Sequence, residues 1–230
     1  MTTPTRTALG KYLLWDVDGT LLRNGPHAGG LYTEAVELAA GRPLEFPAPL
    51  MHGKTDGQIL WETLAANGLD PELHEIASAH LDELSLQRHL GGSRRDIAPG
   101  ILKALAATAD RGWVNSLLTG NSSARTSYKM EGAGLDVDLF DWDHSYFGDR
   151  SPVRSEVTMR AAAHLDGSRI VIIGDTPGDG IGADAAGIPF IAVATGYYSS
   201  EELRATSAVL VVEDLGSGFD EFLAALVDRA

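Results

Sequence analysis

Short apolar runs that end in a polar turn recur along this chain, and they constrain its fold more than any other feature. The first is Tyr12-Leu13-Leu14-Trp15, which ends at Asp16-Val17-Asp18-Gly19-Thr20. Such runs are typical of strands that are buried on both faces of a parallel sheet. We therefore predict five strands, the other four over Trp113–Leu118, Arg169–Ile173, Phe190–Ala194 and Ala208–Val212.

Helical patterns lie between these runs. The expected helices cover Ile101–Ala109, Ser122–Ala133, Glu156–His164 and Gly218–Arg229. Strands that alternate with helices predict an α/β fold, a doubly wound parallel sheet with helices on both faces. Ligands bind such sheets beyond the carboxyl ends of the strands, where this sequence has Asp16, Thr119 and Asp175.

The segment 23–95 breaks this alternation, because it has helical apolar patterns without a buried strand. We predict that residues 23–95 form an inserted helical cap and that residues 1–22 and 96–230 form the core. One predicted apolar face holds Leu31, Ala35 and Leu38, and another includes Ile76. The connections, Arg23-Asn24-Gly25 and 92–100, resemble hinges, so we expect the cap to open and close.

Composition narrows the classes of partner. The 230 residues carry a formal net charge of −14, which disfavours binding to nucleic acid or to an anionic membrane surface. An anionic substrate would need a local positive cluster or a metal cation. The chain has no cysteine and no apolar run of membrane-spanning length, so we expect a cytoplasmic protein. The sequence leaves the oligomeric state undetermined.

Four acidic residues follow two of the predicted strands. Asp16 and Asp18 are separated by one residue, and Asp175 and Asp179 lie in Gly174-Asp175-Thr176-Pro177-Gly178-Asp179. Two carboxylates about 4 Å apart repel each other by roughly 4 kcal/mol at an effective dielectric constant near 20. A cation is therefore expected among them, and a set of oxygen ligands suits Mg²⁺.

Three motifs in this order make the sequence similar to the haloacid dehalogenase superfamily, in its phosphatase branch with an α-helical cap. They are the segment 16–20, Leu117-Leu118-Thr119-Gly120-Asn121, and the segment 174–179. The resemblance covers nearly the whole chain. It implies a Rossmann-like core and a phosphoric monoester hydrolase, similar to phosphoglycolate phosphatases, that acts on a small phosphorylated metabolite with Mg²⁺.

The resemblance also implies roles for individual residues. Asp16 would be the nucleophile that forms an aspartyl-phosphate, and Asp18 would be the general acid and then the base. The metal ligands would be the Asp16 side chain, the Asp18 backbone carbonyl and Asp175, with Asp179 as a ligand or positioning group. The Thr119 hydroxyl and the backbone N–H groups of Gly120 and Asn121 would hold the phosphoryl oxygens.

The third motif of the family departs from its usual pattern in this chain. The family has a lysine that bridges the nucleophile and the phosphoryl group, but no lysine lies between Lys129 and the segment 174–179. Two arginines, Arg150 and Arg154, occupy the corresponding stretch. We predict that Arg154, at the start of a helix, takes this role, although Arg and Lys are not interchangeable.

Each motif also has a purely structural interpretation. Segment 16–20 could be an ordinary turn, and Thr119 could cap the helix that begins near Ser122. Asp175 and Asp179 could lie in a solvated turn, and Arg154 could be a surface residue. In the predicted cap, Thr55 or Asp56 could cap a helix, or His52 and Lys54 could face the substrate. Apart from His52, the histidines are expected at the surface.

These alternatives leave several hypotheses beside the phosphatase. A phosphomutase would pass the phosphoryl group from Asp16 to a sugar hydroxyl, and a phosphonatase would form an imine with a cap lysine, for which Lys54 is the candidate. A non-catalytic ligand-binding relative is favoured by the missing lysine and disfavoured by Asp16 and Asp18. Asp18 disfavours a dehalogenase. A glycine pattern over 178–183 gives only weak support to a dinucleotide-dependent oxidoreductase.

Overall fold

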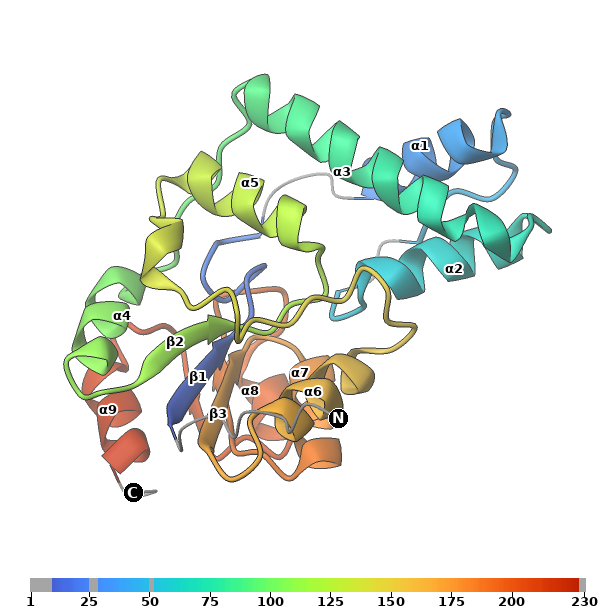
Figure 1. Cartoon of the computed structure of the whole chain (residues 1–230). Coiled ribbons are helices and arrows are strands. Elements are labelled where there is room, and N and C mark those ends of the chain that lie inside the picture. Colours follow the sequence, from blue (N-terminus) through green and yellow to red (C-terminus); the bar gives the residue numbers. More distant parts are fainter. Residues whose placement is uncertain (1–9, 25–28, 50–51, 228–230) are drawn as a thin grey trace, which may run out of the picture.

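The structure is a computed structural model, and it describes residues 10–24, 29–49 and 52–227 (Figure 1). Both ends of the predicted core lie partly outside these residues. So does Gly25, which belongs to the first predicted hinge.

A five-stranded parallel sheet forms the centre of the molecule, as predicted. Its order is β2-β1-β3-β4-β5, with every neighbouring pair parallel. The bounds are Lys11–Trp15 for β1, Val114–Leu117 for β2, Arg169–Gly174 for β3, Phe190–Val193 for β4 and Leu210–Val212 for β5. Ladder hydrogen bonds join β1 directly to both β2 and β3. The ends of these three strands therefore meet at one edge of the sheet.

Alternate residues of β1 pack on opposite faces of the sheet. Leu13 and Trp15 belong to one apolar cluster, and Tyr12 and Leu14 belong to another. The first cluster is completed by α4 (Ile101–Ala109), α5 (Ser123–Ala133) and α9 (Phe219–Val227), and the second by α6 (Arg154–His164), α7 (Pro177–Ala186) and α8 (Ser200–Arg204). This arrangement confirms the doubly wound α/β fold.

The sequence patterns missed α7. Its residues are mainly glycine and alanine, so the helix has no strong apolar stripe. It begins with a capping box in which Thr176 and Asp179 exchange hydrogen bonds, and Pro177 occupies its first turn. These features at the start of α7 were the signal available in the sequence.

Three further helices lie beyond the carboxyl ends of the strands (Figure 1). They are α1 (Gly29–Ala40), α2 (Asp56–Ala66) and α3 (His74–Leu90), and two short 3₁₀ helices cover Pro71–Leu73 and Val137–Leu139. The long helices share their own apolar cluster, which includes Ala35, Leu60 and Leu81. We call α1, α2 and α3 the cap helices. Leu38 and Ile76 were expected on the apolar faces of these helices, but they are exposed.

The start of α2 is held against two loops of the sheet region. The backbone N–H of Asp56 donates to Gly120 O at 2.7 Å, and that of Gly57 donates to Gly148 O at 3.2 Å. A β-carbon on Gly57 would lie 2.7 Å from Asp149 O, so only glycine allows this approach. We call this contact the α2 seam.

Within the part of the chain that the structure describes, no helix is long and apolar enough to cross a membrane.

Candidate active site

Three of the predicted site residues come together where β1 and β3 end. Asp16 follows β1, and its backbone N–H donates to Ile173 O at 2.9 Å. Asp175 follows β3, and Asp179 lies in the first turn of α7. One carboxylate oxygen from each of these three residues lies within 4.8 Å of the others, and all three residues are buried. Such a group of oxygens can hold a cation, which the solvated-turn interpretation does not explain.

Arg154 reaches this group from the start of α6. Its Nη2 atom lies 2.9 Å from Asp16 Oδ1 and 2.6 Å from Asp179 Oδ1, and it donates to Leu118 O at 3.0 Å. The side chain is buried, so the surface interpretation of Arg154 is wrong. Arg150, in contrast, is 73% exposed and lies near Glu75 and Asp149.

The carboxylates outnumber the positive charge at this point. Burial raises the pKa of Asp16, Arg154 lowers it, and Asp179 raises it again, so that the net shift is upward. Burial also raises the pKa of Asp175, and repulsion from Asp16 and Asp179 adds to this effect. Three buried acids and one arginine leave an electrostatic demand for a further cation.

Close packing around Asp175 fixes its side chain. Thr20 donates to Asp175 Oδ1 at 3.1 Å. A β-carbon on Gly19, which has a φ of 86°, would lie 2.2 Å from Asp175 Oδ2. The glycine is required for both its backbone conformation and the space it leaves. The turn after β1 therefore places the Asp175 carboxylate beside Asp16.

Thr119, Gly120 and Asn121 form a buried turn after β2. Asn121 Nδ2 donates to Thr119 Oγ1 at 2.8 Å and to Asp18 Oδ2 at 2.8 Å. The cap of α5 is Ser122, whose side chain accepts from Arg125 N. Thr119 is therefore not the cap of this helix, and it lines the same cavity as Asp16.

Asp18 lies beside two cations that the sequence patterns did not indicate. Lys129 Nζ is 2.5 Å from Asp18 Oδ2, and Arg95 forms an ion pair with Asp18 Oδ1. Burial alone would raise the pKa of Asp18, but Lys129 and Arg95 outweigh this and hold the pKa well below its usual range. The structure therefore favours the carboxylate form of Asp18.

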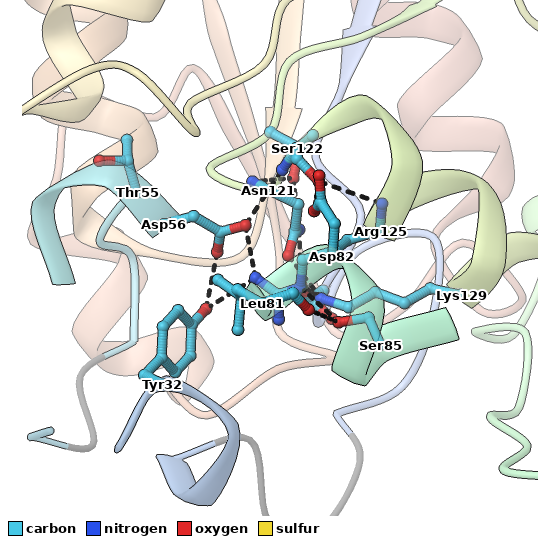
Figure 2. A network of polar contacts seen from close by, with 12 residues as sticks. Tyr32, Thr55, Asp56, Leu81, Asp82, Ser85, Asn121, Ser122, Arg125 and Lys129 are labelled. Carbon is cyan, nitrogen blue, oxygen red and sulfur yellow. Dashed lines mark hydrogen bonds and ion pairs between the residues drawn. The ribbon is translucent and has the colours of Figure 1, made fainter. Parts of the chain in front are cut away.

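Another group that the sequence patterns missed connects the cap helices to α5. Asp56 and Arg125 form a buried ion pair, and Tyr32 donates to Asp56 Oδ1 at 2.7 Å (Figure 2). Arg125 also donates to Tyr32 and Ser85, at 3.2 and 3.0 Å. We call these four residues the Arg125 network. No sequence spacing links them, because they come from α1, α2, α3 and α5.

The Arg125 network also supports the turn at 119–121. The N–H of Ser122 donates to Asp56 Oδ2 at 3.0 Å, and the Asp56 N–H donates to Gly120 O. Asp56 therefore holds the turn on both sides. The N-cap of α2 is Thr55, whose side chain accepts from Gln58 N. The capping interpretation of Thr55 is correct.

His52 and Lys54 line the same cavity as Asp16. The His52 ring stacks on Tyr197, with the centroids 4.5 Å apart, and Lys54 forms an ion pair with Glu62. Another histidine differs from the prediction. His74 is buried rather than at the surface, and its ring stacks on Trp61 at 3.8 Å.

The fold and the site agree with the comparisons to known proteins. A family model described as haloacid dehalogenase-like hydrolase matches residues 13–180, and a second, HAD-hydrolase-like model matches residues 153–217. The chain therefore belongs to the haloacid dehalogenase-like hydrolases, as its motifs predicted.

Individual relatives agree with the phosphatase branch of this family. A phosphoglycolate phosphatase of Rhodospirillum rubrum is 26% identical over 219 residues, which cover 90% of this chain and 88% of the relative. One from Mesorhizobium japonicum is 26% identical, with 94% and 95% covered. The crystal structure of a hydrolase from Pseudomonas syringae superimposes with a TM-score of 0.67 at 18% identity, covering 93% of this chain and 97% of that one. This solved structure supports the fold, while the family model and the two phosphatase relatives support an enzyme of this branch, a phosphoric monoester hydrolase.

Proposed function

We propose that this chain is a magnesium-dependent phosphatase that releases inorganic phosphate from a small phosphorylated metabolite through an aspartyl-phosphate on Asp16. The observation that carries the proposal is the buried group of Asp16, Asp175 and Asp179 with Arg154 in contact. Buried carboxylates in excess of their cations are expected where a metal and a phosphoryl group bind.

The residues at the strand ends fit a magnesium ion. Asp16, Asp175 and Asp179 offer three carboxylate oxygens, and the backbone carbonyl of Asp18 is proposed as a fourth ligand. Mg²⁺ prefers oxygen ligands, and a bound cation would offset the burial and the repulsion from Asp16 and Asp179 that raise the pKa of Asp175. When bound, the metal would offset the negative charge of the phosphoryl oxygens.

The protein groups divide the remaining work. Asp16 is proposed to attack phosphorus, and the Thr119 hydroxyl, the N–H groups of Gly120 and Asn121, and Arg154 are proposed to hold the phosphoryl oxygens. Asp18 is proposed to donate a proton to the leaving oxygen and then to accept one from water. Its pairing with Arg95 and Lys129 favours the carboxylate form, which is the form in which Asp18 would accept that proton.

The size of the cavity supports a small substrate. The cavity around Asp16 has a volume of about 130 Å³, and it is lined from the cap side by His52, Lys54 and Tyr32. These residues are proposed to contact the leaving group. Because the relatives described above are phosphoglycolate phosphatases, phosphoglycolate is the first compound to test. We also keep residues 23–95 as the proposed cap domain, supported by the separate apolar cluster of the cap helices.

The decisive experiment measures phosphate release from a panel of phosphorylated metabolites that includes phosphoglycolate. The natural protein is assayed with Mg²⁺ and with a chelator, and Asp16→Asn is assayed with Mg²⁺. Release that needs Mg²⁺ and disappears in Asp16→Asn supports the proposal. Isomerised sugar phosphate without free phosphate would instead indicate a phosphomutase. Turnover of phosphonates that is lost in Lys54→Met would indicate a phosphonatase.

A further inference from the structure

The turn after β2, residues 119–121, is held by Asp56 at two successive peptide units. In the unit between Gly120 and Asn121, the carbonyl accepts the Asp56 backbone N–H at 2.7 Å. In the next unit, the N–H of Ser122 donates to Asp56 Oδ2 at 3.0 Å, and Asn121 O accepts from the Gly148 N–H at 3.0 Å. The main chain and the side chain of one residue therefore fix the backbone on both sides of Asn121.

The contact with Gly120 O decides where the Asn121 N–H points. In a planar trans peptide unit, the C=O and the N–H point in opposite directions. Because Gly120 O faces the Asp56 N–H, the N–H of Asn121 faces away from it. Thr119 Oγ1 lies on that other side, 3.4 Å from Asn121 N, and Thr119 lines the cavity around Asp16. The bond from Asp56 therefore aims the Asn121 N–H toward the proposed phosphoryl site.

The start of α2 approaches this turn so closely that only glycine fits at position 120. A β-carbon on Gly120 would lie 2.6 Å from Lys54 O and 3.0 Å from Thr55 Cα. On the other flank, a β-carbon on Gly148 would lie 2.8 Å from Gly120 O. Asp56 itself is only 2% exposed. The turn is thus enclosed, and its backbone has little room to take another orientation.

A second acid of the cap helices holds the residue that follows the turn. Ser122 Oγ donates to Asp82 Oδ1 of α3 at 2.5 Å, while the Ser122 N–H donates to Asp56 of α2 (Figure 2). Two cap helices therefore meet the turn at one residue. If these helices moved away from the sheet region, both bonds would break and the turn would lose its supports from the cap.

The ion pair with Arg125 does not account for these contacts. A carboxylate that only neutralised Arg125 would need neither a backbone bond to Gly120 O nor a bond from the Ser122 N–H. In the structure, Asp56 Oδ2 faces both Arg125 and that N–H, while Oδ1 accepts from Tyr32. A purely structural ion pair predicts that removing it lowers stability without a selective loss of anion binding. The experiment below depends on this difference.

We propose that Asp56 is a positioning residue that orients the Asn121 N–H so that this group can hold a phosphoryl oxygen. The inference rests on the proposed phosphatase function and deepens it, because it names the residue that prepares one of the proposed donors. Donors that are already oriented stabilise the charge that develops in the transition state. Since Asp56 begins α2, the donor is aimed only while α2 is docked on the turn. Closure of the cap would therefore complete the phosphoryl site.

The test uses tungstate, a tetrahedral oxyanion that resembles phosphate and is not turned over. Calorimetric titration of the Mg²⁺-loaded protein gives its dissociation constant, and a separate titration gives that of Mg²⁺. Asp56→Ala removes the carboxylate, and Asp56→Asn keeps one side-chain oxygen. The backbone N–H of residue 56 stays, so the losses measure the side-chain contact alone. Ser85→Ala is the matched control, because it removes a hydroxyl that Arg125 contacts in the same network and leaves the turn untouched.

We expect the tungstate dissociation constant to rise about 10-fold in Asp56→Ala and about 3-fold in Asp56→Asn, the range for losing or weakening one hydrogen bond. The kcat of phosphate release should fall in the same order. The Mg²⁺ dissociation constant should stay the same in both variants, and Ser85→Ala should change neither constant. If Asp56→Ala does not fold, Asp56→Asn must still bind tungstate more weakly.

Three results would overturn the proposal. They are no tungstate binding by the natural protein, unchanged tungstate binding in the Asp56 variants, and a parallel loss of tungstate and Mg²⁺ binding. The same titrations keep the two proposals separate. If no compound releases phosphate but only the Asp56 variants bind tungstate more weakly, the phosphatase proposal fails and the positioning role stands. If phosphate is released but neither tungstate binding nor kcat responds, the positioning role fails and the phosphatase stands.

Discussion

Two buried arginines, Arg125 and Arg154, both contact carboxylates, but their surroundings differ. Arg125 faces one acid, Asp56, and hydroxyl groups of Tyr32 and Ser85 complete its contacts. Arg154 faces the group of Asp16, Asp175 and Asp179, so its region has more acids than cations. The comparison teaches that burial of charge alone does not mark an active site. A buried network with more acids than cations is the better candidate for one.

The largest expected effect is a loss of turnover at the group of Asp16, Asp175, Asp179 and Arg154, which we call the unbalanced region. Asp16→Asn should lower kcat by about 10⁴-fold or more, because the amide cannot attack phosphorus. Phosphate release under saturating Mg²⁺ measures this. The matched substitution is Asp56→Asn in the Arg125 network, which we call the balanced region. This variant should keep a far larger fraction of the activity. Comparable losses in both variants would erase the proposed distinction.

The balanced region should instead control stability. Arg125→Met should lower the free energy of unfolding by about 3–5 kcal/mol, because it leaves the buried Asp56 carboxylate without a counter-charge. Urea unfolding followed by circular dichroism measures the change. The double variant Asp56→Leu/Arg125→Met should recover much of the loss, since removing both charges removes the unpaired one. No recovery would show that the two side chains are not coupled.

The two candidates for the third motif should differ in turnover. Arg154→Ala should lower kcat/KM by about 10²–10³-fold, because it removes the positive charge that is proposed to hold the phosphoryl oxygens. Arg150→Ala should change it by less than about 2-fold, because the side chain is exposed and its ion pairs lie at the surface. Equal losses in the two variants would refute the assignment of Arg154.

Magnesium should raise the free energy of unfolding of the protein by binding in the unbalanced region. At a concentration 100 times its dissociation constant, Mg²⁺ should add about 2.7 kcal/mol to the free energy of unfolding. This gain should vanish in Asp175→Asn and persist in Asp56→Asn. Urea unfolding with and without Mg²⁺ tests the pair, and a gain that survives in Asp175→Asn would place the metal elsewhere.

A smaller effect, on the pH dependence of stability, is expected at His74, whose ring stacks on Trp61 of α2. Burial lowers the pKa of His74, so the folded state favours the neutral ring. The unfolded chain binds the proton first as the pH falls through about 6.5, and stability is therefore lost below that pH, until the folded state is protonated too. His74→Phe should flatten the unfolding free energy between pH 7 and 5. An unchanged slope would show that another group causes it.

The strands and the acids that follow them could be predicted because both signals are local. An apolar run marks β1 and β3, and Asp16 and Asp175 come directly after them. Arg154 could be chosen over Arg150 from its place at a helix start. Arg95 and Lys129 could not be predicted beside Asp18, because they come from distant segments that meet only in the folded chain.

The cap showed the same limit in another form. Its helices follow from their apolar spacing, yet Leu38 and Ile76 share that spacing and are exposed. A helix has more apolar positions than its neighbours can cover, so periodicity alone overestimates the buried face. Asp56 was missed for a different reason. As a neighbour of the cap residue Thr55 it resembles an ordinary helix start, and its contact with Arg125 depends on tertiary structure.

Hydrogen exchange at the α2 seam offers a way to time the expected opening of the cap. The amide protons of Asp56 and Gly57 are donated to Gly120 O and Gly148 O, so each bond crosses from the cap helices to the sheet region. Such protons exchange with deuterium only while those bonds are broken. Their exchange rates would therefore report how often the seam separates. A bound phosphate ester that holds both sides together would lower these rates.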